Sequence, residues 1–424
     1  MTRHIAALLV ATGLALVPAG LGAQSKVTLV PSASVSSVFD DNIFAKAVGT
    51  SDQMTLITPA LEATYETPKK LLFGSYTFDM QRSLLHPTLN YLHSRRHGIV
   101  DTQFHLSSRF TVGLGGRYDR TDSPSEFQRF TGLLLDRRRA ERWEGGPSFS
   151  YRISPRTNIS GIYNWISEAV EDGVGGYEQV ARLGITRQLS ERSSFGVGVL
   201  SRRFVSADEA IVPSGLPTAI VRGDVITLHD GYQVVRGGTF VSAAPLASWT
   251  FEVAPATRIS VQAGPRYSAA LDSVVPEIAA GFGRRAPNVI GYGVDYWRGE
   301  SIILGVLGPV EVNSGTARLI VPIRPNLEIG MHGGVFDSQT LSQGRVRVYH
   351  AEIVGSWTTK GLLTIAVGYG TDLQNGDVRS SLLNDQEIVR HVIQVRLTAA
   401  PRLSKMFKPD DPLQPMGVPE KGVK

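Results

Sequence analysis

The segment RISVQAGPRYS, residues 258–268, alternates apolar and polar side chains along its whole length. Its odd-numbered positions, beginning with Ile259, are apolar, and its even-numbered positions, beginning with Arg258, are polar or glycine. Successive side chains of a β-strand point to opposite faces, so a period of two predicts a strand with one apolar and one polar face. The same alternation recurs between residues 27 and 400, and helical spacing occurs nowhere with comparable strength. The chain is therefore predicted to be all-β.

Short turn signals separate the predicted strands at eight places. They are Thr67–Lys70, Ser107–Arg109, Ser154–Thr157, Ser190–Ser193, Ala254–Thr257, Arg285–Asn288, Arg324–Asn326 and Thr358–Gly361. Longer polar stretches lie between them, among them 121–139, 207–238 and 372–386. Tight periplasmic turns that alternate with long outer loops are typical of transmembrane β-barrels. Eight turns join sixteen strands, and one more strand at each end predicts an antiparallel barrel of about 18 strands (about 16–18) over residues 24–400.

Soluble β-sandwiches, propellers and solenoids also alternate, and three features weigh against them. Many predicted strands have about 9–11 residues, enough to cross a bilayer when tilted. Aromatic residues fall near strand ends, as in the interface girdles of membrane barrels. These residues are Trp143, Tyr151, Trp165, Tyr177, Trp297 and Trp357. Finally, the polar face carries ionisable residues deep within strands, which a dry sandwich core would not tolerate without partners.

The two ends of the chain differ from the predicted barrel. Residues 1–23 combine a basic start, an apolar run from Ile5 to Val17 and a small residue, Ala23, before the expected cut. This pattern predicts a cleaved secretory signal peptide. Residues 401–424 hold five prolines, which remove backbone donors from a sheet, so we expect a disordered periplasmic tail.

Composition excludes several classes of function. The 424 residues include no cysteine, so disulfide scaffolds, thiolate catalysis and cysteine-ligated metals are excluded. The net charge is +5, but the 43 basic residues are dispersed, and only Arg137, Arg138 and Arg139 form a block. Dispersed charge makes no stripe along a phosphate backbone, so nucleic-acid binding is not expected.

No motif predicts an enzyme. Gly-x-Ser-x-Gly and His-Glu-x-x-His are missing from the sequence, and no Gly-x-Gly pair completes a dinucleotide fingerprint. His93 and His97 would share a face only on a helix, so they do not predict a zinc site. His105 and Ser107 would share a strand face, which gives a weak candidate for hydrolysis. We therefore expect no catalysis, no cofactor and no metal.

The first mature strand carries a resemblance to a known family. Residues 34–44, SVSSVFDDNIF, are followed by a strand that contains Pro59 and later by the turn Ser154–Thr157. In these features the chain resembles the outer-membrane β-barrel porins associated with bacterial exopolysaccharide biosynthesis clusters. The resemblance implies location in the Gram-negative outer membrane, contact with its lipid and a passive role in polysaccharide export. It also implies a periplasmic export partner, and the oligomeric state stays open.

The charged residues on the polar strand faces are the candidate lumen-lining residues. They are Arg117, Arg152, Arg182, Arg202, Arg258, Arg266, Arg318, Arg396, Asp119, Glu252 and Glu328. In one interpretation the arginines attract an anionic polysaccharide or small solutes into a charged channel. In the other, arginines and acids form salt bridges that hold the wall rigid. The polar strand faces as a whole carry ten arginines and ten acidic residues, and this balance favours the second interpretation for single residues.

A barrel of this size can enclose an aqueous path unless loops plug it. We therefore predict a passive channel connected with exopolysaccharide export. The alternative is a non-conducting surface or scaffold barrel whose long loops 121–139 and 207–238 bind a partner. A nucleotide-driven pump is not expected, because the sequence has no phosphate-binding loop.

Overall fold

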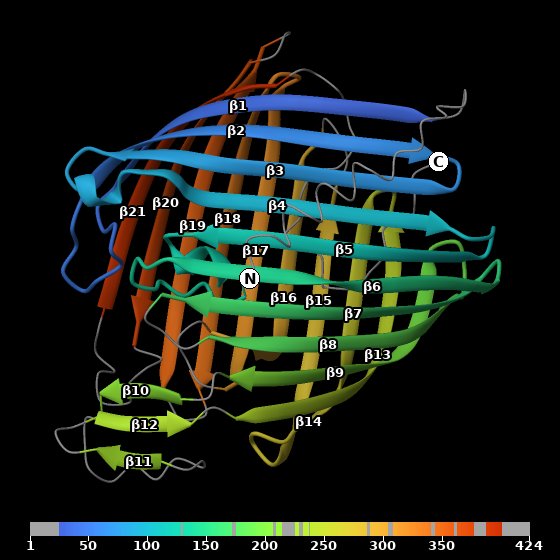
Figure 1. The fold of residues 1–424 in the computed structure, drawn as a ribbon. Coiled ribbons are helices and arrows are strands. Elements are labelled where there is room, and N and C mark those ends of the chain that lie inside the picture. Colours follow the sequence, from blue (N-terminus) through green and yellow to red (C-terminus); the bar gives the residue numbers. More distant parts are fainter. Residues whose placement is uncertain are drawn as a thin grey trace.

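The computed structural model describes residues 25–128, 130–171, 175–206, 209–213, 225–228, 232–236, 238–285, 289–303, 308–340, 344–359, 363–376 and 387–400. The predicted signal peptide 1–23 and tail 401–424 lie outside these residues. Eighteen strands form one antiparallel sheet that closes on itself (Figure 1). Each strand pairs with its neighbours along the chain, and β1 pairs with β21 from Ala33↔Ala399 to Asp40↔Val392. The predicted barrel of about 18 strands is confirmed.

The wall strands are 11 to 16 residues long. They are β1 Lys26–Asp40, β2 Asp52–Thr67, β3 Lys70–Ser83, β4 Tyr91–His105, β5 Phe110–Thr121, β6 Ala140–Ser154, β7 Thr157–Val170, β8 Gly176–Gln188, β9 Ser193–Ser206, β13 Thr239–Ala254, β14 Thr257–Ser268, β15 Ser273–Arg284, β16 Gly291–Ser301, β17 Val310–Arg324, β18 Leu327–Thr340, β19 Arg345–Thr358, β20 Leu363–Asn375 and β21 Glu387–Ala399. Two short 3-10 helices, Pro87–Leu89 and Pro124–Phe127, lie in the longer connections. No helix among the described residues is long and apolar enough to span a membrane.

All eight predicted turn signals lie at connections between consecutive wall strands. These connections share one end of the barrel, and the longer segments share the other (Figure 1). The longest one, between β9 and β13, contains a separate antiparallel sheet of β10 Glu209–Pro213, β12 Tyr232–Arg236 and β11 Val225–Leu228. The sequence predicts only a polar loop here, because strands of four or five residues are too short to show a clear alternation.

The apolar face of each strand forms the outside of the barrel. In β14, Tyr267 is 49% exposed on the outer surface, whereas its neighbour Arg266 is 0% exposed inside. Leu29, Leu183 and Ile393 are likewise exposed on other strands. Such a surface requires an apolar solvent around the barrel, because apolar area left in water is unfavourable.

Most of the predicted girdle aromatics point outward and form pairs on this surface. Trp143 packs on Tyr118 with ring centroids 4.3 Å apart, and Trp165 lies 6.5 Å from Tyr177. The prediction for Trp297 is wrong. Its side chain points into the barrel, where it packs against a buried apolar cluster and an inward-folded segment, described below. Neighbouring residues of a strand point to opposite faces, and Tyr296 points outward, so the side chain of Trp297 must point inward.

Candidate functional site: the barrel lumen

Six of the predicted lumen residues lie on inner strand faces, away from the short-turn end. They are Arg117, Asp119, Arg182, Arg202, Arg266 and Arg318. The other five share strand faces with inward residues but lie near the short-turn end. They are Arg152, Arg258, Glu252, Glu328 and Arg396, and all but the partly exposed Glu252 are exposed.

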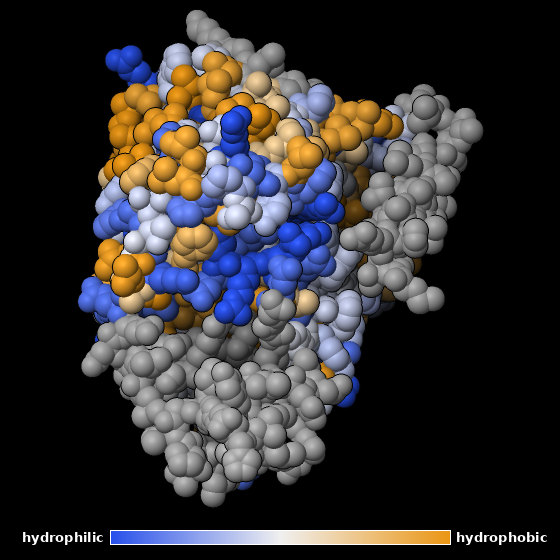
Figure 2. Space-filling model, turned by 60° about the vertical axis from the view of Figure 1, so that its left-hand side comes forward, coloured by the Kyte–Doolittle hydropathy of each residue, from blue (hydrophilic) through white to orange (hydrophobic). Residues whose placement is uncertain are grey.

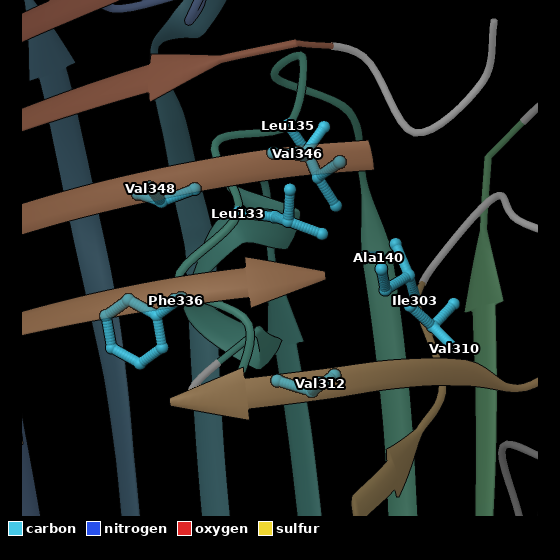
Figure 3. Close-up of a cluster of buried hydrophobic side chains, with 9 residues drawn as sticks. All are labelled: Leu133, Leu135, Ala140, Ile303, Val310, Val312, Phe336, Val346 and Val348. Atoms are coloured by element: carbon cyan, nitrogen blue, oxygen red, sulfur yellow. The ribbon is translucent and has the colours of Figure 1, made fainter. Parts of the chain in front are cut away.

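The connection between β5 and β6, residues 122–139, folds into the barrel over its described residues 122–128 and 130–139. Its residues Leu133 and Leu135 are buried against inner side chains of β17, β18 and β19, such as Val312 and Phe336 (Figure 3). Gly132 has a φ of +61°, and a Cβ at this position would lie 2.5 Å from the Phe336 ring. Only glycine combines this backbone conformation with so close an approach. We call residues 122–139 the inner loop.

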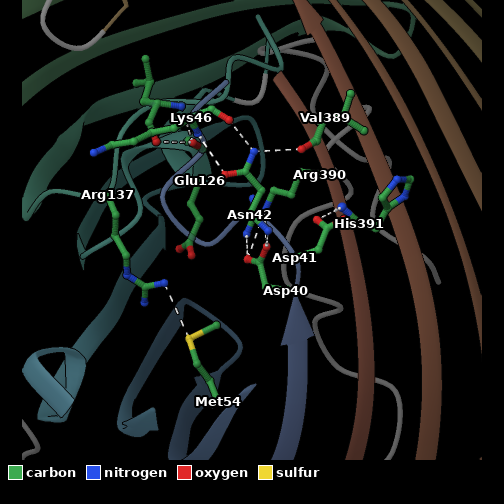
Figure 4. A network of polar contacts seen from close by, with 12 residues as sticks. Asp40, Asp41, Asn42, Lys46, Met54, Glu126, Arg137, Val389, Arg390 and His391 are labelled. Atoms are coloured by element: carbon green, nitrogen blue, oxygen red, sulfur yellow. Dashed lines mark hydrogen bonds and ion pairs between the residues drawn. The ribbon is translucent and has the colours of Figure 1, made fainter. Parts of the chain in front are cut away.

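Polar contacts hold the inner loop to the wall on both sides. The Leu134 amide donates to Oε1 of Gln374 on β20 at 2.8 Å. The Arg137 guanidinium donates to Oε1 of Gln81 at 3.1 Å and contacts Sδ of Met54, which Figure 4 draws. The loop therefore crosses from β5 and β6 to the opposite wall and obstructs part of the lumen.

This position overturns the interpretation of 121–139 as an outward, partner-binding loop. Thr121, Thr131 and Leu133 are buried inside the barrel, so they offer no outer surface. The run Leu133-Leu134-Leu135 was the signal that could have shown this, because three consecutive leucines are out of place in an exposed polar loop. The second loop named in that interpretation, 207–238, is described only for Gly238 and for the backbone of its three short strands.

The end of β1 and the segment after it form polar contacts with β21, at the seam where the barrel closes. Asp40 is fully buried and pairs with Arg390, with Oδ2 and Nη2 2.6 Å apart. Asn42 donates from Nδ2 to the carbonyls of Lys46 at 2.7 Å and Val389 at 2.9 Å (Figure 4). The Asp-Asn motif that carries the resemblance therefore stabilises the pairing of β1 with β21, which closes the barrel.

A cavity of about 310 Å³ lies between the inner loop and the wall of β6 to β9 and β13 to β18. Phe127 and Phe130 of the loop and Trp297 of β16 line its loop side. Its wall carries carboxylates from Glu144, Glu168, Glu178, Glu277, Asp295 and Glu300, and guanidinium groups from Arg142, Arg182 and Arg202. Six acidic side chains against three basic ones give this chamber an excess of acidic groups.

A buried ion-pair network supports one wall of the chamber. Glu277 forms ion pairs with two arginines: Oε1 lies 2.8 Å from Nη2 of Arg202, and Oε2 lies 3.2 Å from Nη1 of Arg266. Arg266 also contacts Glu311, and its Nη1 lies 3.9 Å from Glu300. For Arg202 and Arg266 these contacts favour the salt-bridge interpretation over solute binding, since both guanidinium groups are already occupied by wall carboxylates.

Arg117 is also engaged by a neighbour on the same face. Its Nε donates to Oδ2 of Asp119 at 2.6 Å, and His97 bonds to the other carboxylate oxygen. Figure 2, which turns the loop-bearing end forward, shows hydrophilic side chains across the middle of the visible face and apolar ones near its upper edge. Arg117 is therefore already paired on the inner face of β5.

The weak hydrolytic candidate is not assembled. Nδ1 of His105 lies 3.0 Å from Oγ1 of Thr111, across the turn. The Ser107 hydroxyl accepts from the amides of Arg109 and Phe110, as expected in a turn. His105 and Ser107 thus serve separate structural contacts.

No family model and no curated protein sequence matches this chain. Among solved structures, it is similar to OccK5 (OpdH) of Pseudomonas aeruginosa, with a TM-score of 0.44, 9% identity, and coverage of 88% of this chain and 98% of that one. It is also similar to OpdQ of the same organism, with a TM-score of 0.45 and 8% identity, covering 88% of this chain and 98% of OpdQ. A third similar structure is a mutant of the P. aeruginosa ferric enterobactin receptor PfeA, with a TM-score of 0.46 and 8% identity, covering 89% of this chain and 81% of the receptor.

Proposed function

We propose that this protein is an outer-membrane channel through which small polar solutes diffuse, with cations favoured over anions. The observation that carries the proposal is the acidic chamber beside the inner loop. Six carboxylate side chains, Glu277 among them, and three guanidinium groups line it, and one further arginine behind it, Arg266, is paired with Glu277 and Glu311. Rings of acidic side chains favour cations in pores, because a cation is stabilised where field lines concentrate.

The outer surface of the barrel supports location in a membrane. Apolar side chains cover it, aromatic pairs lie upon it, and the sheet has no free edge because β1 pairs with β21. A closed barrel satisfies its backbone hydrogen bonds internally, as a hydrocarbon solvent demands. The predicted signal peptide would direct the chain out of the cytoplasm.

The connection with exopolysaccharide export is the finer part of the proposal. It is supported by the resemblance in residues 34–44, 59 and 154–157. The inner loop packs across the lumen against β17 to β19, so export of a polymer would require this loop to leave the wall. A strain that lacks this protein should then secrete less polysaccharide, with a periplasmic partner delivering the polymer. Unchanged secretion would remove this part and leave the channel proposal intact.

Planar-bilayer recordings across a potassium chloride gradient test the channel itself. The purified barrel should open and give a reversal potential of cation preference. Glu144→Gln with Asp295→Asn should lower that preference, and Glu191→Gln, exposed in the turn between β8 and β9, serves as the matched control. Complete absence of conductance would favour the non-conducting scaffold, whose remaining binding loop would be 207–238. An anion preference would refute the role of the acidic chamber.

A further inference from the structure

Two histidines and a glutamate meet on the inner wall, in a place that the chamber does not use. His332 lies on β18, and His350 and Glu352 lie on β19, with His332 directly opposite Glu352 in the register. One ligand atom from each of the three lies within 4.8 Å of the others, and the two imidazole centroids are 5.4 Å apart. Within the described residues, no other group of three such side chains lies so close.

A second carboxylate orients one of the imidazoles. Nδ1 of His350 lies 2.6 Å from Oδ1 of Asp372, the residue opposite it on β20. This contact engages Nδ1 and leaves Nε2 available as a ligand atom. Histidines that bind metals usually have such a carboxylate or carbonyl behind them, which sets the tautomer and raises the basicity of the free nitrogen.

The neighbouring positions leave room for an ion and its water. Gly330 lies two residues from His332 on the same face, and Gly370 lies opposite Glu352. A Cβ at either glycine would meet nothing closer than 3.9 Å. Arg318 lies opposite His332 on β17, but its Nε lies beside Gly293 of β16, on the side away from β19.

We propose that His332, His350 and Glu352 bind a divalent transition-metal ion of the Zn²⁺ class, with Asp372 as a positioning residue. Two imidazoles and a carboxylate are a donor set that Zn²⁺ favours, with water in the fourth position. Bonds of about 2.0 Å in a tetrahedral site require the donors to approach each other more closely than they do now. The exposed Glu352 side chain has the freedom to make this movement. The bound ion would link β18 to β19.

Equilibrium dialysis and calorimetry with Zn²⁺, on the full chain purified in detergent without a histidine tag, test the proposal independently of conductance. One Zn²⁺ per chain is expected, and Mg²⁺ should not compete, because it prefers oxygen ligands. His350→Ala and His332→Ala should each abolish the site. Asp372→Asn should weaken Zn²⁺ binding by about 10- to 100-fold, which is the usual effect of removing a carboxylate that hydrogen-bonds to a metal-binding histidine.

His97→Ala is the matched control, because His97 also faces inward and bonds to a carboxylate, that of Asp119, yet belongs to no such group of three. It should bind Zn²⁺ like the unaltered protein. Heat-dependent gel migration shows whether each variant is a folded barrel, and Glu352→Gln offers a milder second variant. The proposal is overturned if the unaltered protein binds no Zn²⁺, or if folded His350→Ala and His332→Ala bind it undiminished.

Discussion

Replacing Leu133 by alanine should release the inner loop from the wall. Leu133 is 0% exposed and belongs to one apolar cluster with Val312, Phe336 and Val348. Leucine-to-alanine changes at buried sites cost about 2–5 kcal/mol. The lower part of this range, about 2–3 kcal/mol, applies to a loop that can leave the wall instead of keeping a cavity. Since 1.4 kcal/mol is a factor of ten, the ratio of docked to undocked loop should fall by about 30- to 140-fold.

Single-channel recording in planar bilayers measures this shift. Leu133→Ala should show more frequent and longer openings of high conductance than the unaltered protein. Leu114→Ala is the control, because Leu114 is 56% exposed on the outer face of β5, the strand that leads into the inner loop. Both variants should keep the heat-dependent gel migration of a folded barrel. Unchanged openings in folded Leu133→Ala, or the same change in Leu114→Ala, would refute the assignment of the inner loop as the obstruction.

Three further predictions concern stability, measured by urea or thermal unfolding. Asp40→Asn should lower the free energy of unfolding by about 3 kcal/mol, because it breaks the buried ion pair with Arg390 at the seam. Asp337→Asn is the control and should change this free energy little, because its ion pair with Arg345 is exposed to solvent. Arg266→Gln should destabilise the barrel, because Arg266 is the fully buried partner of Glu277 and Glu311, whereas Arg152→Gln, at an exposed position, should change little; equal stability of the two variants would contradict a structural role for Arg266. Burial raises the pKa of Asp122, so its ionised form costs stability at neutral pH and this cost disappears as the pH falls through the folded pKa. Asp122→Asn should therefore unfold at a higher temperature than the unaltered protein at about pH 7 but not at about pH 3, and equal melting at both values would contradict a raised pKa.

The alternation of side chains was enough to predict the barrel, because the period of two is a local property of every strand. In residues 258–268 it separates the outward Tyr267 from the inward Arg266 without any knowledge of the neighbouring strands. The turn signals are local as well, so counting them led to the observed 18 strands. A membrane barrel connects consecutive strands, and this rule converts a list of strands into a topology.

The partners of inward side chains were decided only by the tertiary structure. Asp40 and Arg390 are 350 residues apart and meet because the barrel closes, and Leu133 is buried because its loop turns inward instead of outward. The run of three leucines signals burial, but the apolar surface that receives it belongs to β17 to β19, across the lumen and far away in the sequence. Likewise, His332, His350 and Glu352 come together through the register of β18 with β19. Sequence periodicity determines which face a side chain occupies, whereas its partners follow from strand register and closure, which bring distant segments together.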